Sequence, residues 1–252
     1  MREELLLLGL SHGAERLVMI GDPRQLGPLV SLRHLPWLSE DQQSALELEL
    51  LGSSFSRLYE AGHYCFLDTQ YRMHPAIAAF PSAEFYDGRL KTKFDNKPVE
   101  FDWPDPSRPL AFLHVEGKER RSGSSYSNQE EVEAVKLVLG RVFSSPSLVL
   151  TKKEVCVLSL YSGQVKLLRL AGLGVEVATI DSYQGRENSL VIVTTVRASG
   201  RIGKKPGLVI LFYVEIFSGY SDDQRRVNVL LTRAKAGLII VGHQETLLTS
   251  SI

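Results

Sequence analysis

Two segments of the sequence each carry an arginine among residues that could bind phosphate. Leu67–Pro75 reads LDTQYRMHP and includes Arg72, while Arg225–Gly242 reads RRVNVLLTRAKAGLIIVG and includes Arg233. A planar guanidinium is well suited to negative charge that develops on a phosphoryl group, and such an arginine can accelerate phosphoryl transfer by about 10³–10⁵. The two segments therefore indicate phosphate chemistry. The simpler alternative for a lone arginine is a surface ion pair.

A third segment, Gly21–Pro28 (GDPRQLGP), places Gln25 just after an apolar run. A neutral amide can donate a hydrogen bond to a phosphoryl oxygen and accept one from water, which no charged side chain can do. Gln25 is therefore a candidate phosphate sensor. The alternative is a solvated side chain in a turn that Pro23 and Pro28 close.

The fourth segment, Val177–Asn188 (VATIDSYQGREN), leaves an apolar run and turns at Gly185. Gln184 and Glu187 flank this turn, within reach of a nucleotide. Asp181 has an equally simple role as the cap of the following turn.

The next apolar run ends in short hydroxyls and a cation, Thr194, Thr195 and Arg197. These residue types suit contacts with a nucleic-acid backbone, which position a strand without specifying its sequence. A β-branched threonine is also simply a good strand former, so both interpretations stay open.

Apolar runs that alternate with helical patterns must position these residues, and they predict an α/β fold with a mostly parallel sheet flanked by helices. Ser127 and Glu130 have the spacing of a capping box before a helix. The polar run 116–128 and the stretch 91–109 are expected to be loops. Strands are predicted at Arg16–Ile20, Ala111–Val115, Val155–Ser159, Val175–Ile180, Leu190–Val196 and Leu238–Val241, and helices within 31–63, at Ala76–Phe80 and across Asn228, Thr232 and Lys235.

In their order, the four segments resemble the later motifs of superfamily 1 helicases of the Upf-type, senataxin-like branch. The resemblance implies two RecA-like lobes that clamp ATP with Mg²⁺ and step 5′→3′ along single-stranded RNA or DNA. It implies that Gln25 senses the γ-phosphate, that Arg72 and Arg233 reach it, and that Tyr71 stacks on adenine. A half-buried core tyrosine is the alternative for Tyr71.

The same resemblance gives roles to the remaining residues. Gln184 and Gly185 are expected to shape the ATP cleft, and Glu187 to lie near the ribose or the γ-phosphate. Thr179, Thr195 and Arg197 are expected to face the nucleic-acid strand. The implied organisation is the end of a first RecA-like lobe (1–30), a helical connector (31–65) and a second RecA-like lobe (66–252). The second lobe is expected to be an AAA-type helicase carboxyl-terminal domain.

The sequence departs from that family pattern in a decisive place. A search for G-x-x-x-x-G-K-[ST] finds only Gly117-Lys118-Glu119 and Gly203-Lys204-Lys205, neither with the required glycine upstream or hydroxyl downstream. An Asp-Glu pair to hold Mg²⁺ is also missing. We therefore expect this chain to need a first RecA-like lobe as its partner and to be unable to hydrolyse ATP alone. The alternative is a truncated or non-catalytic module that binds single-stranded nucleic acid or a protein.

Two further departures affect the second lobe. Leu160 stands where the family usually has proline, which weakens the match at Tyr161 and Gln164. An apolar stretch also intervenes between Arg197 and Arg225.

Composition excludes several protein classes. The 252 residues include 29 Lys+Arg and 29 Asp+Glu with 44% hydrophobic residues, so a disordered chain is excluded. Two distant cysteines predict neither a disulfide framework nor a zinc site. The longest apolar run, Gly207–Phe217, has 11 residues, about half of what a membrane span needs. We expect a soluble protein of the nucleus or cytoplasm, without a resident metal.

Overall fold

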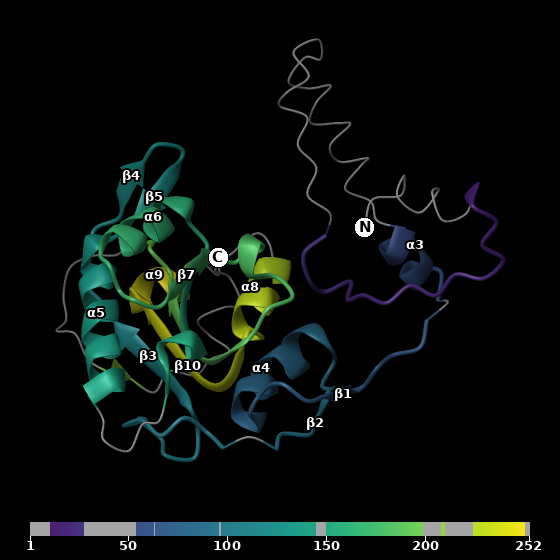
Figure 1. Cartoon of the computed structure of the whole chain (residues 1–252), viewed down its shortest axis with the longest axis horizontal. Coiled ribbons are helices and arrows are strands. Elements are labelled where there is room, and N and C mark those ends of the chain that lie inside the picture. The colour runs from purple at the N-terminus through teal and green to yellow at the C-terminus, as the bar shows by residue number, and fades with distance from the viewer. Residues whose placement is uncertain are drawn as a thin grey trace, which may run out of the picture. The chain divides into compact units, whose positions relative to one another are not determined.

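A computed structural model describes residues 11–27, 54–62, 64–95, 97–144, 150–198, 208–209 and 224–249. The chain forms two compact units, Met1–Leu67 and Asp68–Ile252. Figure 1 shows their helices and strands, which are labelled where there is room. The candidate functional residues lie in the second unit, except Gln25.

The described part of the first unit contains the helix α3 (Ser54–Glu60) and an extended segment. The predicted strand Arg16–Ile20 is wrong, because this segment has no strand pairing and Val18 and Ile20 are 84% and 88% exposed. A strand needs a neighbour for its backbone groups, and the described residues of this unit offer none. Most of the predicted helical region 31–63 lies outside the described residues; its last turns form α3.

The second unit is built on a six-stranded sheet in the order β7-β6-β8-β10-β3-β9. The first five strands run parallel, as predicted, and β9 is antiparallel to β3. Their bounds are β7 Glu176–Thr179, β6 Val155–Ser159, β8 Asn188–Thr194, β10 Ala234–Gly242, β3 Leu110–His114 and β9 Leu208–Val209. The central strands are buried on both faces, which is why they appear in the sequence as continuous apolar runs.

Helices cover both faces of this sheet, as Figure 1 shows. The core joins α5 (Gln129–Ser144) and α6 (Ser162–Leu170) to alternate strand residues such as Val157, Ile192 and Ile239. The helices α4 (Pro75–Phe85) and α8 (Gln224–Leu231) pack together, and α4 contacts β10. The helix α9 (Gln244–Thr249) follows β10. Within the part of the chain that the structure describes, no helix is long and apolar enough to cross a bilayer.

Several short elements differ from the prediction. The polar run 116–128 is not a loop but contains a hairpin of β4 (Arg120–Ser122) and β5 (Ser125–Ser127). Within 91–109, β2 (Lys91–Thr92) pairs with β1 (Thr69–Gln70). The cap of α5 is Asn128, whose Oδ1 accepts a hydrogen bond from the Glu131 N–H at 3.2 Å, rather than Ser127. Two 3₁₀ turns, η1 (Lys152–Glu154) and η2 (Asp181–Tyr183), complete the unit.

Candidate functional site

The loop that carries Tyr71 and Arg72 is held by the side chain of Gln70. Its Oε1 accepts hydrogen bonds from the backbone N–H groups of Arg72 (3.0 Å) and Met73 (2.8 Å). Its Nε2 donates to the Met73 carbonyl (3.0 Å) and to the Thr92 hydroxyl (2.8 Å). The loop is therefore fixed while Tyr71 stays 64% exposed. Lys93 Nζ lies 5.9 Å from the centre of this ring, and an exposed ring of this kind is suited to stacking.

Arg72 and Lys235 share one carboxylate, that of Glu187. Arg72 Nε forms an ion pair with Glu187 Oε2, and Lys235 Nζ lies 3.0 Å from Glu187 Oε1. Arg72 Nη1 also donates to the Thr232 carbonyl at 3.1 Å. Burial alone would raise the pKa of Glu187, but the hydrogen bonds from Arg72 and Lys235 outweigh it and lower the pKa. The result is two cations held beside one anion, with 30–39% of each side chain exposed.

Lys235 does not lie on the predicted helix. The helix α8 ends at Leu231, and Lys235 is the second residue of strand β10. Its carbonyl accepts a hydrogen bond from the His74 N–H at 2.7 Å, which joins the Tyr71–Arg72 loop to the sheet. The sequence pattern does not mark this lysine as a site residue, because a lysine on the predicted helix has solvation as its simplest role.

Arg233 is turned inward and is only 1% exposed. Its Nε donates to the Val229 carbonyl (2.9 Å), Nη1 to the Arg186 carbonyl (3.1 Å) and Nη2 to the Thr232 hydroxyl (2.8 Å). In this arrangement the Arg233 guanidinium is bound within the lobe and does not face solvent, which differs from the expectation that it reaches the γ-phosphate. Its guanidinium instead ties the end of α8 to the segment before β8.

The remaining predicted nucleotide residues lie in turns. Gln184 and Gly185 are exposed after η2, and Gly185 has a φ of +80°, a conformation that favours glycine. Asp181 pairs with Arg226 at 3.2 Å. In the first unit, Gln25 Nε2 donates to Asp22 Oδ2 at 2.9 Å, which holds the turn around it.

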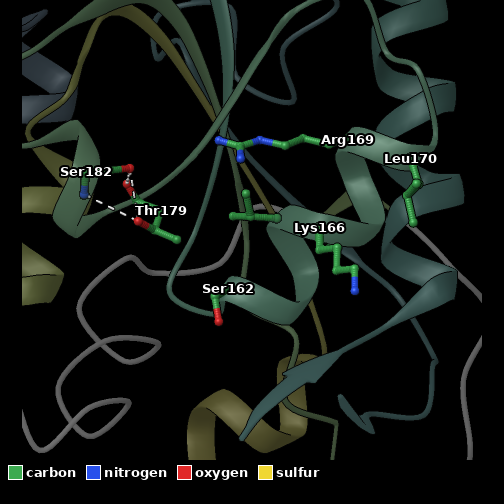
Figure 2. Close-up of a pocket in the computed structure, with 7 residues that line it drawn as sticks. Ser162, Lys166, Arg169, Leu170, Thr179 and Ser182 are labelled. Carbon is green, nitrogen blue, oxygen red and sulfur yellow. Dashed lines mark hydrogen bonds between the residues drawn. The ribbon is translucent and has the colours of Figure 1, made fainter. Parts of the chain in front are cut away.

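A groove of about 540 Å³ lies between α6 and the segment from β7 to η2. Figure 2 shows Ser162 and Lys166 on α6, with Thr179 and Ser182 on the other wall. The Thr179 hydroxyl donates to the Ser182 hydroxyl at 3.0 Å and accepts from the Ser182 N–H at 3.3 Å. Arg169 donates to the Val177 carbonyl through Nε (3.2 Å) and Nη2 (2.8 Å). The groove thus combines hydroxyls with a solvent-facing lysine.

The turn after β8 places Thr195 and Arg197 in different environments. Thr195 is 1% exposed and its hydroxyl lies 3.5 Å from Glu131 Oε1, so it does not reach the surface. Arg197 is half-buried; its Nε donates to Glu119 Oε2 at 2.8 Å, and its guanidinium lies 4.7 Å from the centre of the Tyr126 ring. Hydrogen bonds to the Tyr161 hydroxyl and to Glu119 raise the pKa of Arg197.

Glu131 is a further residue that sequence analysis missed. Its side chain is fully buried, and both carboxyl oxygens accept the Val196 N–H, at 2.8 and 3.0 Å. Burial raises the pKa of Glu131 to about 8, partly offset by these hydrogen bonds. A glutamate three residues after Asn128 has capping-box spacing, which predicts only a bond back to the helix cap. In the structure this side chain reaches the turn after β8 instead of the helix cap.

The described residues do not hold a candidate metal centre, because no three His, Cys, Asp or Glu side chains gather there in a suitable arrangement. The cations Arg72 and Lys235 suit an anionic group, and the exposed ring of Tyr71 suits a planar base. Together they fit a ligand such as a nucleotide. They do not fit Mg²⁺, whose preferred ligands are oxygens.

Comparison with known proteins identifies the family. The model of AAA_12, an AAA domain, matches residues 50–245. The regulator of nonsense transcripts 1 homolog of Drosophila melanogaster is 33% identical over 253 residues, covering 93% of this chain and 19% of that protein. The ATP-dependent helicase upf1 of Schizosaccharomyces pombe is 32% identical over 259 residues, covering 96% of this chain and 25% of that protein.

One solved structure is weakly similar to this chain. The C-terminal domain of a possible DNA helicase from Lactobacillus plantarum aligns over 73% of this chain and 94% of that chain, with 15% identity and a TM-score of 0.38. The chain spans about a fifth to a quarter of the length of the two relatives above. On the family match and these identities, the chain belongs to the Upf1-like family of superfamily 1 helicases.

Proposed function

We propose that this chain is the second motor lobe of an ATP-dependent helicase that moves 5′→3′ along single-stranded RNA or DNA. The observation that carries the proposal is the convergence of three separate segments on one carboxylate: Arg72 and Lys235 both contact Glu187. Family membership supports the same conclusion. The protein would act in the nucleus or cytoplasm.

At the nucleotide, Tyr71 would stack on the base, and Arg72 would donate to the terminal phosphate. ATP supplies the phosphoryl bond whose hydrolysis drives movement. Arg233 would support this site indirectly in the arrangement seen here, because its three donors hold the Arg186 and Val229 carbonyls and the Thr232 hydroxyl. Gln184, Gly185 and Glu187 would line the same site.

The lobe that completes the site would bring the remaining groups. We assign the P-loop and the Mg²⁺ ligands to a first RecA-like lobe, because this sequence has no P-loop. Gln25 would sense the γ-phosphate at the boundary of that lobe. Alone, the chain should therefore not hydrolyse ATP.

The groove between α6 and β7 is the proposed path of the nucleic-acid strand. Thr179 and Ser182 offer hydroxyls, and Lys166 offers a cation that is exposed to solvent. Such groups contact phosphates and sugars without reading bases. Thr195 would act here only through the backbone turn that carries Arg197, since its side chain is buried.

Binding of a labelled single strand by the 252-residue chain, titrated against salt, tests the proposal. We expect log Kd to rise with log [salt], and Lys166→Ala to reduce that slope by about 0.7, the loss of one contact with a single-stranded phosphate. Lys136→Ala is the matched control, because Lys136 is an exposed lysine of α5 that pairs with Glu133. Absence of salt-dependent binding, or single-strand-stimulated ATP hydrolysis by this chain alone, would overturn the proposal.

A further inference from the structure

Three side chains from different elements meet beyond the carboxyl ends of β6 and β8. The Arg197 guanidinium lies 4.7 Å from the centre of the Tyr126 ring, and the rings of Tyr126 and Tyr161 meet edge to face with their centres 5.7 Å apart. Tyr126 belongs to the hairpin strand β5, Tyr161 precedes α6, and Arg197 follows β8. We propose that this Tyr126–Tyr161–Arg197 cluster is a stacking site for one unpaired base of the bound strand. This inference rests on the proposed function.

The backbone that carries Arg197 is held in an unusual conformation. Val196 has a φ of +70°, which is a genuine outlier for a β-branched residue. The fully buried Glu131 carboxyl holds the Val196 N–H with both oxygens, and the Arg197 N–H donates to the Thr195 carbonyl at 2.8 Å. Strain of this kind persists only where surrounding contacts impose it, and it concentrates at functional sites.

A second carboxylate fixes Arg197 from the hairpin side. Glu119 Oε2 accepts from Arg197 Nε at 2.8 Å and from the Ala198 N–H at 2.9 Å. Two acidic side chains therefore set the direction of one arginine. Even so, 37% of the Arg197 side chain remains exposed, which leaves part of it open to a ligand.

The chemistry of the cluster favours a base over a phosphate. Glu119 already neutralises the Arg197 charge and would repel a phosphate placed against it. A guanidinium plane and tyrosine rings stack on any base, and this stacking tolerates every sequence. Along the chain the cluster adjoins the groove, because Tyr161 is followed directly by Ser162, which lines the groove. A strand whose phosphates follow the groove can thus present a base to the cluster.

The test compares two ligands of equal length, an oligo(dT) strand and the same sugar-phosphate strand without bases. We expect the unmodified chain to bind oligo(dT) about tenfold more tightly, as expected for stacking of one base. Arg197→Lys keeps the charge but loses the plane, and Tyr126→Leu loses the ring. Each should abolish the preference while changing affinity for the abasic strand less than about twofold. Arg121→Lys, an exposed arginine of the same hairpin, should leave both affinities unchanged.

The outcomes separate this inference from the proposed function. Equal, salt-dependent binding of both ligands by the unmodified chain would overturn the stacking site and leave the groove intact. An equal loss of both affinities in Arg197→Lys would make Arg197 a phosphate contact and also overturn it. No binding of either ligand would overturn the proposed function itself. Thermal unfolding monitors folding, and if Tyr126→Leu does not fold, Arg197→Lys decides alone.

Discussion

Glu131 makes the stability of the second unit depend on pH in an unusual direction. Burial raises the pKa of its carboxyl from an ordinary value of 4.5 to about 8 in the folded chain. The folded state then keeps a proton that the unfolded state releases, so stability falls as pH rises from about 5 to 8, by at most about 1.4 kcal/mol per pH unit. An amide at this position does not titrate. We therefore expect Glu131→Gln to gain stability relative to the unmodified chain across this range and to level off above about pH 8.

Urea unfolding of both proteins at several pH values measures this difference. Other titrating groups cancel because the two chains share them, including Glu130, whose charge also raises the pKa of Glu131. The control is Glu133→Gln, since Lys136 holds the pKa of the exposed Glu133 carboxyl below its usual value. A Glu131→Gln difference that stays constant between about pH 5 and 8 would mean that Glu131 is ionised in the folded chain.

The exposure of single residues could be predicted from the sequence only for some of the motif residues. Tyr71 and Arg72 were expected to be available to a ligand, and Tyr71 is exposed while Arg72 is partly so. Arg233 was assigned by its place in a family motif and Thr195 by its place after an apolar run, yet both are 1% exposed. Burial depends on which segments pack over a residue, and no local pattern around these two residues specifies that.

At the scale of elements, the hairpin β4–β5 depends on close contact with α6. The Gly163 N–H donates to the Ser125 hydroxyl at 3.1 Å, and a Cβ added at Gly163 would lie 2.7 Å from the Tyr126 carbonyl oxygen. Gly163→Ala should therefore push the hairpin away and destabilise the chain by about 1–3 kcal/mol, as overpacking does. Limited tryptic cleavage at the exposed Arg120 and Arg121 should become faster. Urea unfolding measures the loss of global stability, with which the change in cleavage rate can be compared.

Gly140 provides the matched control for that substitution. It lies within α5, and a Cβ added there would meet nothing within 4 Å. Gly140→Ala should stabilise the chain by about 0.5–1 kcal/mol, because alanine loses less backbone entropy in a helix. If Gly163→Ala leaves both stability and cleavage at the hairpin unchanged, the contact between α6 and β5 is looser than the structure indicates.

The positions of the buried strands could be predicted from the sequence better than those of the exposed ones. The strands β6 and β8 are buried, and their apolar runs predicted them closely. The hairpin was missed because its strands are short and polar, and its formation depends on Ser125 and Tyr126 meeting α6. The segment Arg16–Ile20 has the opposite problem: its apolar run resembles a buried strand, but a run of residues cannot supply the neighbouring strand that pairing needs.

At the scale of the whole second unit, the parallel sheet separates two sets of candidate residues. Glu187 and Lys235 lie where β8 and β10 begin, whereas Thr179 is the last residue of β7 and Arg197 follows the end of β8. The sequence predicted the sheet and its direction. It did not predict this separation, because the segment 180–187 returns from the end of β7 to the beginning of β8 and so places neighbouring motif residues at opposite edges.

This separation predicts that the two edges act independently within this chain. The seven residues of β8 span about 20 Å, and charges are screened over about 10 Å at 0.1 M salt. Glu187→Gln removes the anion that Arg72 and Lys235 share, so affinity for tripolyphosphate should rise several-fold by calorimetry. Affinity for oligo(dT) should change less than about twofold. A larger change would mean that the segment 180–187, which joins Thr179 to Glu187, transmits a structural change between the edges, since screened charge could not.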